Sequence, residues 1–342
     1  MVNAIVKEAN LQKNYLNEPV KTIYFGGGTP SLLTIEELQF TIEELKKIFI
    51  VDDISEITLE ANPDDIDEEK LIEWKTIGIN RLSIGIQSFN NDDLKWMNRV
   101  HTAEHAIQCL QLATKHFDNI SIDLIYGSPT LTDEQWKKNV QTALSFNIPH
   151  LSCYALTVET KTALNRLINQ NKKENIDADK QAKHFELLMQ WLNDAGYEHY
   201  EISNFAKKNF RSKHNSSYWK GFPYLGLGPS AHSFNGISRQ WNIANNALYI
   251  KSIEQNIIPS EIEILTPTHQ LNEYIMISLR TMEGINFLDD KWKMMDEKIK
   301  NKIILSAKKW EALGNISINE NSIRLTNKGK FLADGIAADL FQ

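Results

Sequence analysis

Cysteine is scarce in this sequence: Cys109 and Cys153 are the only two among 342 residues. Their number excludes a disulfide scaffold and is typical of a protein from a reducing compartment. Neither cysteine stands near the other or in a CxxC spacing. Cys109 lies on a helical pattern and Cys153 on an apolar strand pattern, so we expect both to be ordinary buried side chains.

Long apolar runs and an excess of basic charge are also absent. No run approaches the roughly 18 apolar residues that a membrane span needs. The first residues, Met1–Glu8, show neither the basic segment nor the cleavage site of a secretory signal. A net charge of −7 and a pI near 5.8 provide no basic field for nucleic acid or anionic lipid. We therefore expect a cytoplasmic protein with a small-molecule or protein partner, no membrane span and no nucleic-acid ligand.

From Lys21 to about Thr157 the sequence alternates short β-branched runs with longer amphipathic segments. This order predicts βα units around a parallel sheet. Five mostly apolar strands are expected: Thr22–Phe25, Ser55–Ala61, Arg81–Gln87, Ser121–Tyr126 and His150–Leu156. Helical patterns lie between them, for example Thr34–Phe49 and Thr132–Phe146.

The rest of the chain predicts two further parts. A helix is expected at Asp177–Ala195, and the aromatic-rich stretch Tyr197–Ile243 predicts short strands and ordered loops. From Gln270 the order helix, helix, hairpin, helix suggests a winged-helix-like module. We therefore divide the chain into a partial α/β barrel at 1–160, a mixed middle region with the remainder of the barrel at 161–265, and a C-terminal helical module at 266–342.

Polar residues interrupt the apolar runs where the predicted strands end. Three glycines at 26–28 would let backbone N–H groups approach a carboxylate or phosphate, although a tight turn without a ligand has the same pattern. Glu60, Gln87 and Asp123 stand at the ends of or inside other apolar runs, where burial requires either a ligand or a backbone partner. Ligands of parallel α/β folds bind at the carboxyl ends of the strands. We expect Gly27 and these three side chains to line one pocket there.

The motifs GGGTP, LEANP, GIQSF, NRVH, IDLIYGSP and HLSCYALTVE occur in this order. Together with RTMEG at 280–284 and LADGIAADLF at 332–341, they resemble the radical S-adenosylmethionine (SAM) coproporphyrinogen-oxidase-like family from about Lys7 to the C-terminus. The resemblance implies a radical SAM-type parallel (β/α) barrel with SAM as a cofactor. It also implies a set of SAM contacts: Gly27, Gly28, Thr29, Glu60, Gln87, Arg99 and Asp123. Donors, a cation and carboxylates suit such a zwitterionic, sulfonium-bearing ligand.

The sequence departs from that family in one respect. The family holds a [4Fe–4S] cluster through CxxxCxxC in the loop after its first strand, and three thiolates are required there. Cys109 and Cys153 cannot replace this motif. We expect an incomplete barrel that lacks its first strand, in a chain whose Met1 is an internal methionine of a longer reading frame. A genuine cluster-free form is the alternative, but it would leave the apolar edge at Thr22–Phe25 exposed.

Within the family, the run HNSSYW at 214–219 resembles the HNxxYW motif of a heme-chaperone branch. The resemblance implies binding of heme and SAM and delivery of heme to a recipient apoprotein, without coproporphyrinogen oxidase activity. His214 is the expected iron ligand because a histidine beside aromatic faces suits a macrocycle, and His232 is the reserve ligand. A packed aromatic loop with a hydrogen-bonded histidine is the alternative.

Three other functions stay open. The first is an oxygen-independent coproporphyrinogen III oxidase of porphyrin biosynthesis. A second is a cluster-free barrel lyase or hydrolase that uses Glu60 and Asp123 as acid and base. The third is a scaffold protein that uses only its C-terminal module, whose thermal stability SAM would not change.

Overall fold

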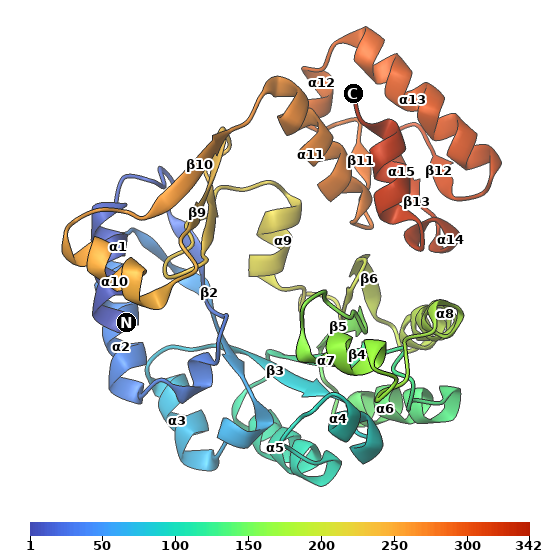
Figure 1. The fold of residues 1–342 in the computed structure, drawn as a ribbon. Helices are drawn as coiled ribbons and strands as arrows, with labels where there is room; N and C mark the ends of the chain where they lie inside the picture. The colour runs from blue at the N-terminus through green and yellow to red at the C-terminus, as the bar shows by residue number, and fades with distance from the viewer. The chain divides into compact units, whose positions relative to one another are not determined.

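The computed structural model describes residues 1–342 and shows a mixed α/β protein with a curled main sheet (Figure 1). The sheet has seven strands in the order β1-β2-β3-β4-β5-β7-β6. β2, β3, β4 and β5 pair in parallel, whereas β7 is antiparallel to both β5 and β6. The bounds are Val20–Phe25 (β1), Val51–Ala61 (β2), Arg81–Gln87 (β3), Ile120–Tyr126 (β4), His150–Ala155 (β5), Glu198–Glu201 (β6) and Asn204–Ala206 (β7). The predicted partial parallel barrel is confirmed.

The two faces of the main strands differ in polarity. On β3, Leu82, Ile84 and Ile86 are fully buried on one face, whereas the other face carries Arg81 and Ser83. The strands are therefore less uniformly apolar than predicted, because the inner face of the sheet is polar. Figure 1 shows helices outside the curled sheet: α3 (Glu68–Thr76), α5 (Ala103–His116), α6 (Asp133–Ser145) and α8 (Ala178–Asp194).

Local sequence signals explain where several helices begin. Thr34 caps α2 (Ile35–Ile48) in a capping box with Glu37, as its sequence predicts. Thr132 caps α6 in the same way with Gln135. Four short elements connect the main ones: η1 (Pro30–Leu32), η2 (Pro63–Asp65), α4 (Asn91–Trp96) and α7 (Ala163–Asn169).

Besides the short α7 and α12 (Asp290–Lys293), three helices were not predicted. α1 (Val2–Leu11) and α10 (Asn246–Glu254) contact each other. The third is α9 (Lys213–Trp219), which contains the HNSSYW run. The expectation of strands and loops there was wrong, because a helix of seven residues without a buried side chain has no apolar periodicity to detect.

The strands of the middle region form a second, antiparallel sheet. Its order is β10-β9-β8, with bounds Ser260–Ile264 (β10), Ser238–Asn242 (β9) and His232–Phe234 (β8). β8 pairs with β9 so that His232 lies opposite Trp241 and Phe234 opposite Arg239. Alternation along the strands places these four residues on one face of the sheet.

The C-terminal residues form a third sheet with its own helices. The strands are β11 (Ile285–Asn286), β13 (Ser322–Leu325) and β12 (Ile316–Ile318), and the helices are α11 (Pro267–Leu279), α12 (Asp290–Lys293), α13 (Glu297–Ala312), α14 (Asn327–Lys330) and α15 (Ala333–Leu340). Ile275, Ile303, Ile323 and Ile336 share one buried core. The predicted order of helices and hairpin is present, but the last predicted helix is split into α14 and α15.

The chain divides into two units, each of which is described by itself. Unit 1 comprises 1–23, 33–56 and 213–342, and unit 2 comprises 24–32 and 57–212. The boundaries expected near 160 and 265 stay a prediction. None of the helices combines the length and the apolar character required to cross a bilayer.

Candidate functional site

The glycine run after β1 holds the carboxylate of Glu60. The Gly27 N–H donates to Glu60 Oε2 over 3.1 Å, and the Tyr24 hydroxyl donates to Oε1 over 2.7 Å. Gly27 and Gly28 have φ of 75° and 64°, in the left-handed region where glycine is unstrained. At Gly26 a Cβ would lie 2.5 Å from the Tyr24 ring and 3.0 Å from Glu60 Oε1. Glu60 thus has fixed partners at the end of β2, and the loop backbone is close beside it.

Three polar side chains converge over the inner face of β3. A Cβ added to Gly85 would lie 3.0 Å from Gln87 Nε2, 3.7 Å from Arg99 Nη2 and 3.9 Å from Asn62 Oδ1. Gln87 is buried and has φ of 65°, an uncommon conformation for a non-glycine residue. The absence of a side chain at position 85 therefore leaves room where an amide and a guanidinium meet.

Asp123 lies in the middle of β4, close enough to Glu60, Arg99 and Arg81 for their charges to act on it. Burial, followed by the charge of Glu60, raises the pKa of Asp123 to about 7, although Ser152 and the two arginines oppose this shift. Burial lowers the pKa of Arg99, against the opposing effect of Asp123. The site therefore contains a carboxyl group, Asp123, whose charged form is disfavoured by its surroundings.

The structure brings together five of the residues predicted as SAM contacts: Gly27, Glu60, Gln87, Arg99 and Asp123. Gly28 is exposed in the same loop, and Thr29 begins the turn that leads into η1 through a hydrogen bond from Leu32 N. Tyr24, Asn62 and Arg81 also belong to this group but were not predicted. Tyr24 lies two residues before the GGGTP motif, and Asn62 is part of LEANP two residues after Glu60, so period-2 alternation along a strand could have identified both.

Arg81 is the least expected member of this group. It opens β3, is 1% exposed, and its Nε and Nη2 atoms have no hydrogen-bond partner. The adjacent β2 position, Thr58, is also fully buried with an unpaired hydroxyl. An arginine at the start of an otherwise apolar strand was the only available signal in the sequence.

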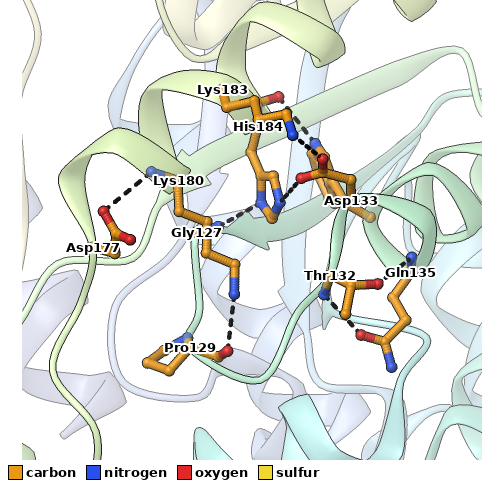
Figure 2. A network of polar contacts seen from close by, with 10 residues as sticks. Gly127, Pro129, Thr132, Asp133, Gln135, Asp177, Lys180, Lys183 and His184 are labelled. Atoms are coloured by element: carbon orange, nitrogen blue, oxygen red, sulfur yellow. Dashed lines mark hydrogen bonds and ion pairs between the residues drawn. The ribbon is translucent and has the colours of Figure 1, made fainter.

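The loop that follows Asp123's strand is fixed by a closed polar network (Figure 2). The Gly127 N–H donates to His184 Nδ1 over 3.2 Å, and His184 Nε2 faces Asp133 Oδ1 at 3.2 Å. Lys183 also pairs with Asp133, and Lys180 donates to the Pro129 carbonyl. His184 Nδ1 accepts a hydrogen bond, whereas Nε2 is within ion-pair distance of Asp133 without a well-aligned hydrogen bond, so this histidine–aspartate pair connects α8 to the loop.

The predicted heme ligand His214 lies in α9 with both ring nitrogens engaged. Nδ1 is 3.0 Å from the Thr22 hydroxyl, and Nε2 is 2.9 Å from the Tyr218 hydroxyl. The Lys213 and His214 backbone N–H groups both donate to the Glu56 carboxylate. His214 is thus a partly buried, tethered helix residue, and the expectation of strands and loops at this position is corrected.

His232, the reserve ligand, has different surroundings from His214. It is exposed on β8, and its ring stacks on Trp241 with centroids 6.3 Å apart and planes 29° apart. No hydrogen bond or ion pair holds its ring. Further along the same sheet face, Tyr224 pairs with Phe234, and Tyr218 packs edge-on against Tyr224 at 4.7 Å.

The two cysteines are buried and separate in the fold. Cys109 is in α5 and Cys153 is in β5. No group of three or more histidine, cysteine, aspartate or glutamate side chains could hold a metal ion. The residues of this chain therefore do not fit a cluster that needs three thiolates.

Comparisons with known proteins agree with this architecture. The family model of the radical SAM superfamily matches residues 3–143. Heme chaperone HemW of Bacillus subtilis is 33% identical over an alignment of 342 positions, which covers 98% of this chain and 87% of that protein. Heme chaperone HemW of Lactococcus lactis is 32% identical over 93% of this chain and 86% of that protein. Coproporphyrinogen III oxidase (HemN) from Escherichia coli has the same fold, with a TM-score of 0.83, 21% identity, and coverage of 99% of this chain and 82% of that one.

Proposed function

Because this chain belongs to the HemW family of radical SAM proteins, we propose that it binds heme and SAM and delivers heme to a recipient apoprotein. The relationship to Heme chaperone HemW over 98% of the chain is the observation that carries the proposal. The likeness to HemN, at 21% identity, concerns the fold alone. Two surfaces of this chain support the proposal, one for each ligand.

The donor set in unit 2 suits SAM. Glu60 and Asp123 provide carboxylates for an ammonium and for ribose hydroxyls, and the Arg99 guanidinium provides a cation for the methionine carboxylate. Gln87 adds an amide that can donate and accept. SAM would supply a sulfonium centre; the role of these residues is to bind and orient its polar groups. No electron-transfer step is proposed, because the cysteines of this chain do not fit the [4Fe–4S] cluster.

The sheet face around His232 suits heme. An iron ligand must offer a ring nitrogen, and the His232 ring has no competing hydrogen bond, whereas His214 would first have to release Thr22 or Tyr218. Trp241, directly opposite His232, provides a large flat surface for a macrocycle. We therefore propose His232 as the first axial ligand, with His214 as the second candidate.

Heme titration of four variants tests this assignment. His232→Ala should weaken heme binding about tenfold or more and shift the Soret band, because the iron loses its ligand. His214→Ala should have a smaller effect on the spectrum. His269→Ala is the matched control, since His269 is an exposed histidine of the same unit outside the aromatic face. Trp241→Ala should weaken binding without changing the iron ligand.

The outcomes separate the candidate functions. A spectrum unchanged in His232→Ala but altered in His214→Ala moves the ligand to His214. Absence of heme binding by the parent protein removes the chaperone function and favours the oxidase. Turnover of a substrate by the chain without cluster or heme, abolished by Glu60→Gln, would instead favour the lyase or hydrolase.

A further inference from the structure

A row of buried hydroxyl and imidazole groups runs behind Asp123, across three strands of the main sheet. Ser152 is the strand partner of Asp123, its hydroxyl favours the Asp123 carboxylate, and its Oγ lies 3.4 Å from the Oγ of Ser121. Ser121 Oγ is 2.7 Å from His150 Nδ1, and His150 Nε2 is 2.7 Å from the Tyr200 hydroxyl. We call these four residues, Ser152, Ser121, His150 and Tyr200, the relay.

Strand register explains why the relay is continuous. Asp123 is the partner of Ser152 across β4 and β5, and Ser121 is the partner of His150 two positions earlier. The side chains of Asp123, Ser121, Ser152 and His150 therefore lie on the same inner face of the sheet. Each relay residue is at most 3% exposed, so water cannot easily replace one of its partners.

The relay has a direction that is set by the imidazole. Burial, followed by the charge of Arg81, lowers the pKa of His150 well below its usual range, so the ring is neutral and carries one proton. One ring nitrogen must then donate and the other accept. If the Asp123 carboxylate is ionised, Ser152 donates to it, Ser121 donates to Ser152, and His150 Nδ1–H donates to Ser121. His150 Nε2 then accepts from the Tyr200 hydroxyl.

Protonation of Asp123 reverses this order. The carboxylic acid can donate to Ser152, each hydroxyl can turn to donate onward, and Nδ1 can accept from Ser121. The ring must then lose its Nδ1 proton to solvent and take up one at Nε2, so that the only net gain is the proton on Asp123, and Nε2–H donates to the Tyr200 oxygen while the Tyr200 hydroxyl hydrogen turns away. We propose that the relay positions the Asp123 carboxyl and couples its ionisation to the tautomer of His150. The roles of Asp123 as a ligand contact and of the relay as its support rest on the proposed SAM site, but the coupling itself requires no ligand.

Other groups also act on Asp123 and limit what the relay controls. Glu60 on β2 favours the protonated acid, whereas Arg81 on β3 and Arg99 favour the carboxylate. The remaining titratable groups that interact with Asp123 are Tyr24 on β1 and Cys153 and Tyr154 on β5. None of these belongs to the relay, although the Ser152 hydroxyl also acts on Tyr154, so removal of a relay residue leaves the charges of Glu60, Arg81 and Arg99 in place.

The experiment is a pH titration of the tautomer of His150 in the full chain, labelled with ¹⁵N-histidine and followed by long-range ¹H–¹⁵N correlation. His150→Gln identifies the signals. We expect the Nδ1–H tautomer at pH 8.5 and a shift toward the Nε2–H tautomer at pH 5.5. The midpoint should lie near pH 7, to which burial raises the pKa of Asp123. In Asp123→Asn the tautomer should not change over this range.

Two further variants define the path. Ser152→Ala interrupts the relay and should remove the coupling even if Asp123→Asn does not fold. Tyr197→Phe is the control, because the Tyr197 hydroxyl is buried and bonds to the Ile148 carbonyl outside the relay, so the switch should persist. A pH-independent tautomer in the parent, or the same switch in Asp123→Asn, would overturn the proposal. Either result leaves heme and SAM binding untouched, so the two proposals can fail separately.

Discussion

Two carboxylates of the candidate site experience opposite surroundings although both face the inside of the sheet. Glu60 accepts from the Tyr24 hydroxyl and the Gly27 N–H, which stabilise its charge. The Ser152 hydroxyl favours the Asp123 carboxylate, but burial and the nearby Glu60 charge outweigh that effect on its pKa. A side chain whose charged form costs free energy in the folded protein is suited to gain from a cationic ligand. The Asp123 carboxylate should therefore favour SAM binding but lower the stability of the folded protein.

Asp123→Asn should therefore stabilise the protein at neutral pH. The folded-state pKa of Asp123 is raised to about 7 from an ordinary value of 3.8. Between these values the folded protein holds the proton that the unfolded chain releases, so the ionisation of Asp123 reduces stability as pH rises. We expect the thermal midpoint of the variant to exceed that of the parent by about 2–4 °C at pH 7.5 and to equal it near pH 4. Differential scanning fluorimetry across this range measures the difference.

Asp133→Asn provides the control of opposite sign. The Lys183 ammonium lowers the pKa of Asp133, so this carboxylate stabilises the fold above its unfolded pKa and loses that effect as pH falls. The variant should have a lower midpoint than the parent at pH 7.5. If both variants shift in the same direction, the pKa argument for Asp123 is wrong.

The open position at Gly85 leads to a second prediction for a single residue. Gly85→Ala places a Cβ 3.0 Å from Gln87 Nε2, and the amide must move away. Gly85 does not have a positive φ, so alanine itself fits the strand backbone. We expect affinity for SAM to fall about tenfold with little change in thermal midpoint, as measured by isothermal titration calorimetry. Gly335→Ala is the control, since its Cβ meets no atom within 4 Å. Unchanged affinity in Gly85→Ala would place SAM elsewhere.

At the scale of elements, α1 is joined to the second sheet by one buried carboxylate. Glu8 is 0% exposed and accepts from the Gly228 N–H at 2.8 Å, the Tyr249 hydroxyl at 2.5 Å, and Asn242 Nδ2 at 2.7 Å. Gln12, one turn later in α1, donates to the same carboxylate. Burial raises the pKa of Glu8, while these four bonds oppose the shift. A single side chain thus fixes α1, α10 and the glycine-rich loop before β8.

Glu8→Ala should destabilise unit 1 by about 3 kcal/mol, because its buried donors lose their acceptor. Hydrogen exchange should become faster at the Gly228 amide and in β8, next to the proposed heme ligand His232. Glu43→Ala, an exposed glutamate of α2, should leave exchange at these sites unchanged. Retained protection of Gly228 in Glu8→Ala would show that the loop is held by other contacts.

The sequence predicted those elements well that depend on interactions between residues close together in the chain. The strand cores and the capping box of Thr34 follow from apolar runs and from residues three positions apart. α9 has no such signal, because its first five residues are polar and its position depends on Thr22 and Glu56, far away in sequence. The same distinction applies to the site. Glu60, Gln87 and Asp123 could be predicted as polar residues in apolar runs, but the relay to Tyr200 exists only through the pairing of strands.

For the whole molecule, the two proposed ligands belong to different units. The candidate SAM residues lie within 24–32 and 57–212, whereas His214 and His232 lie within 213–342. Each ligand should therefore protect its own unit first. The iron–sulfur chemistry associated with the radical SAM superfamily would have to be supported by cysteines, and both cysteines of this chain are in unit 2.

Reconstitution of the full chain under anaerobic conditions with iron and sulfide should yield much less than one [4Fe–4S] cluster per chain. A thiolate is the required ligand form, and burial raises the pKa of Cys109 to about 12 and that of Cys153 still further. Two protonated, buried thiols cannot replace three exposed thiolates, so dithionite and SAM should give no 5′-deoxyadenosine. Iron and sulfide analysis together with product chromatography measures both outcomes.

The double variant Cys109→Ala/Cys153→Ala should bind as little iron as the parent, which would show that any residual iron is not bound by these thiols. A variant with an added N-terminal segment that contains CxxxCxxC should bind the cluster and cleave SAM, because the Glu60, Gln87 and Asp123 groups are already in place. If the parent protein assembles a full cluster and the double variant does not, the cysteines must leave their buried positions in α5 and β5. Such a result would require a rearrangement of the sheet around Asp123, and the pH dependence of the His150 tautomer would then disappear in the loaded protein.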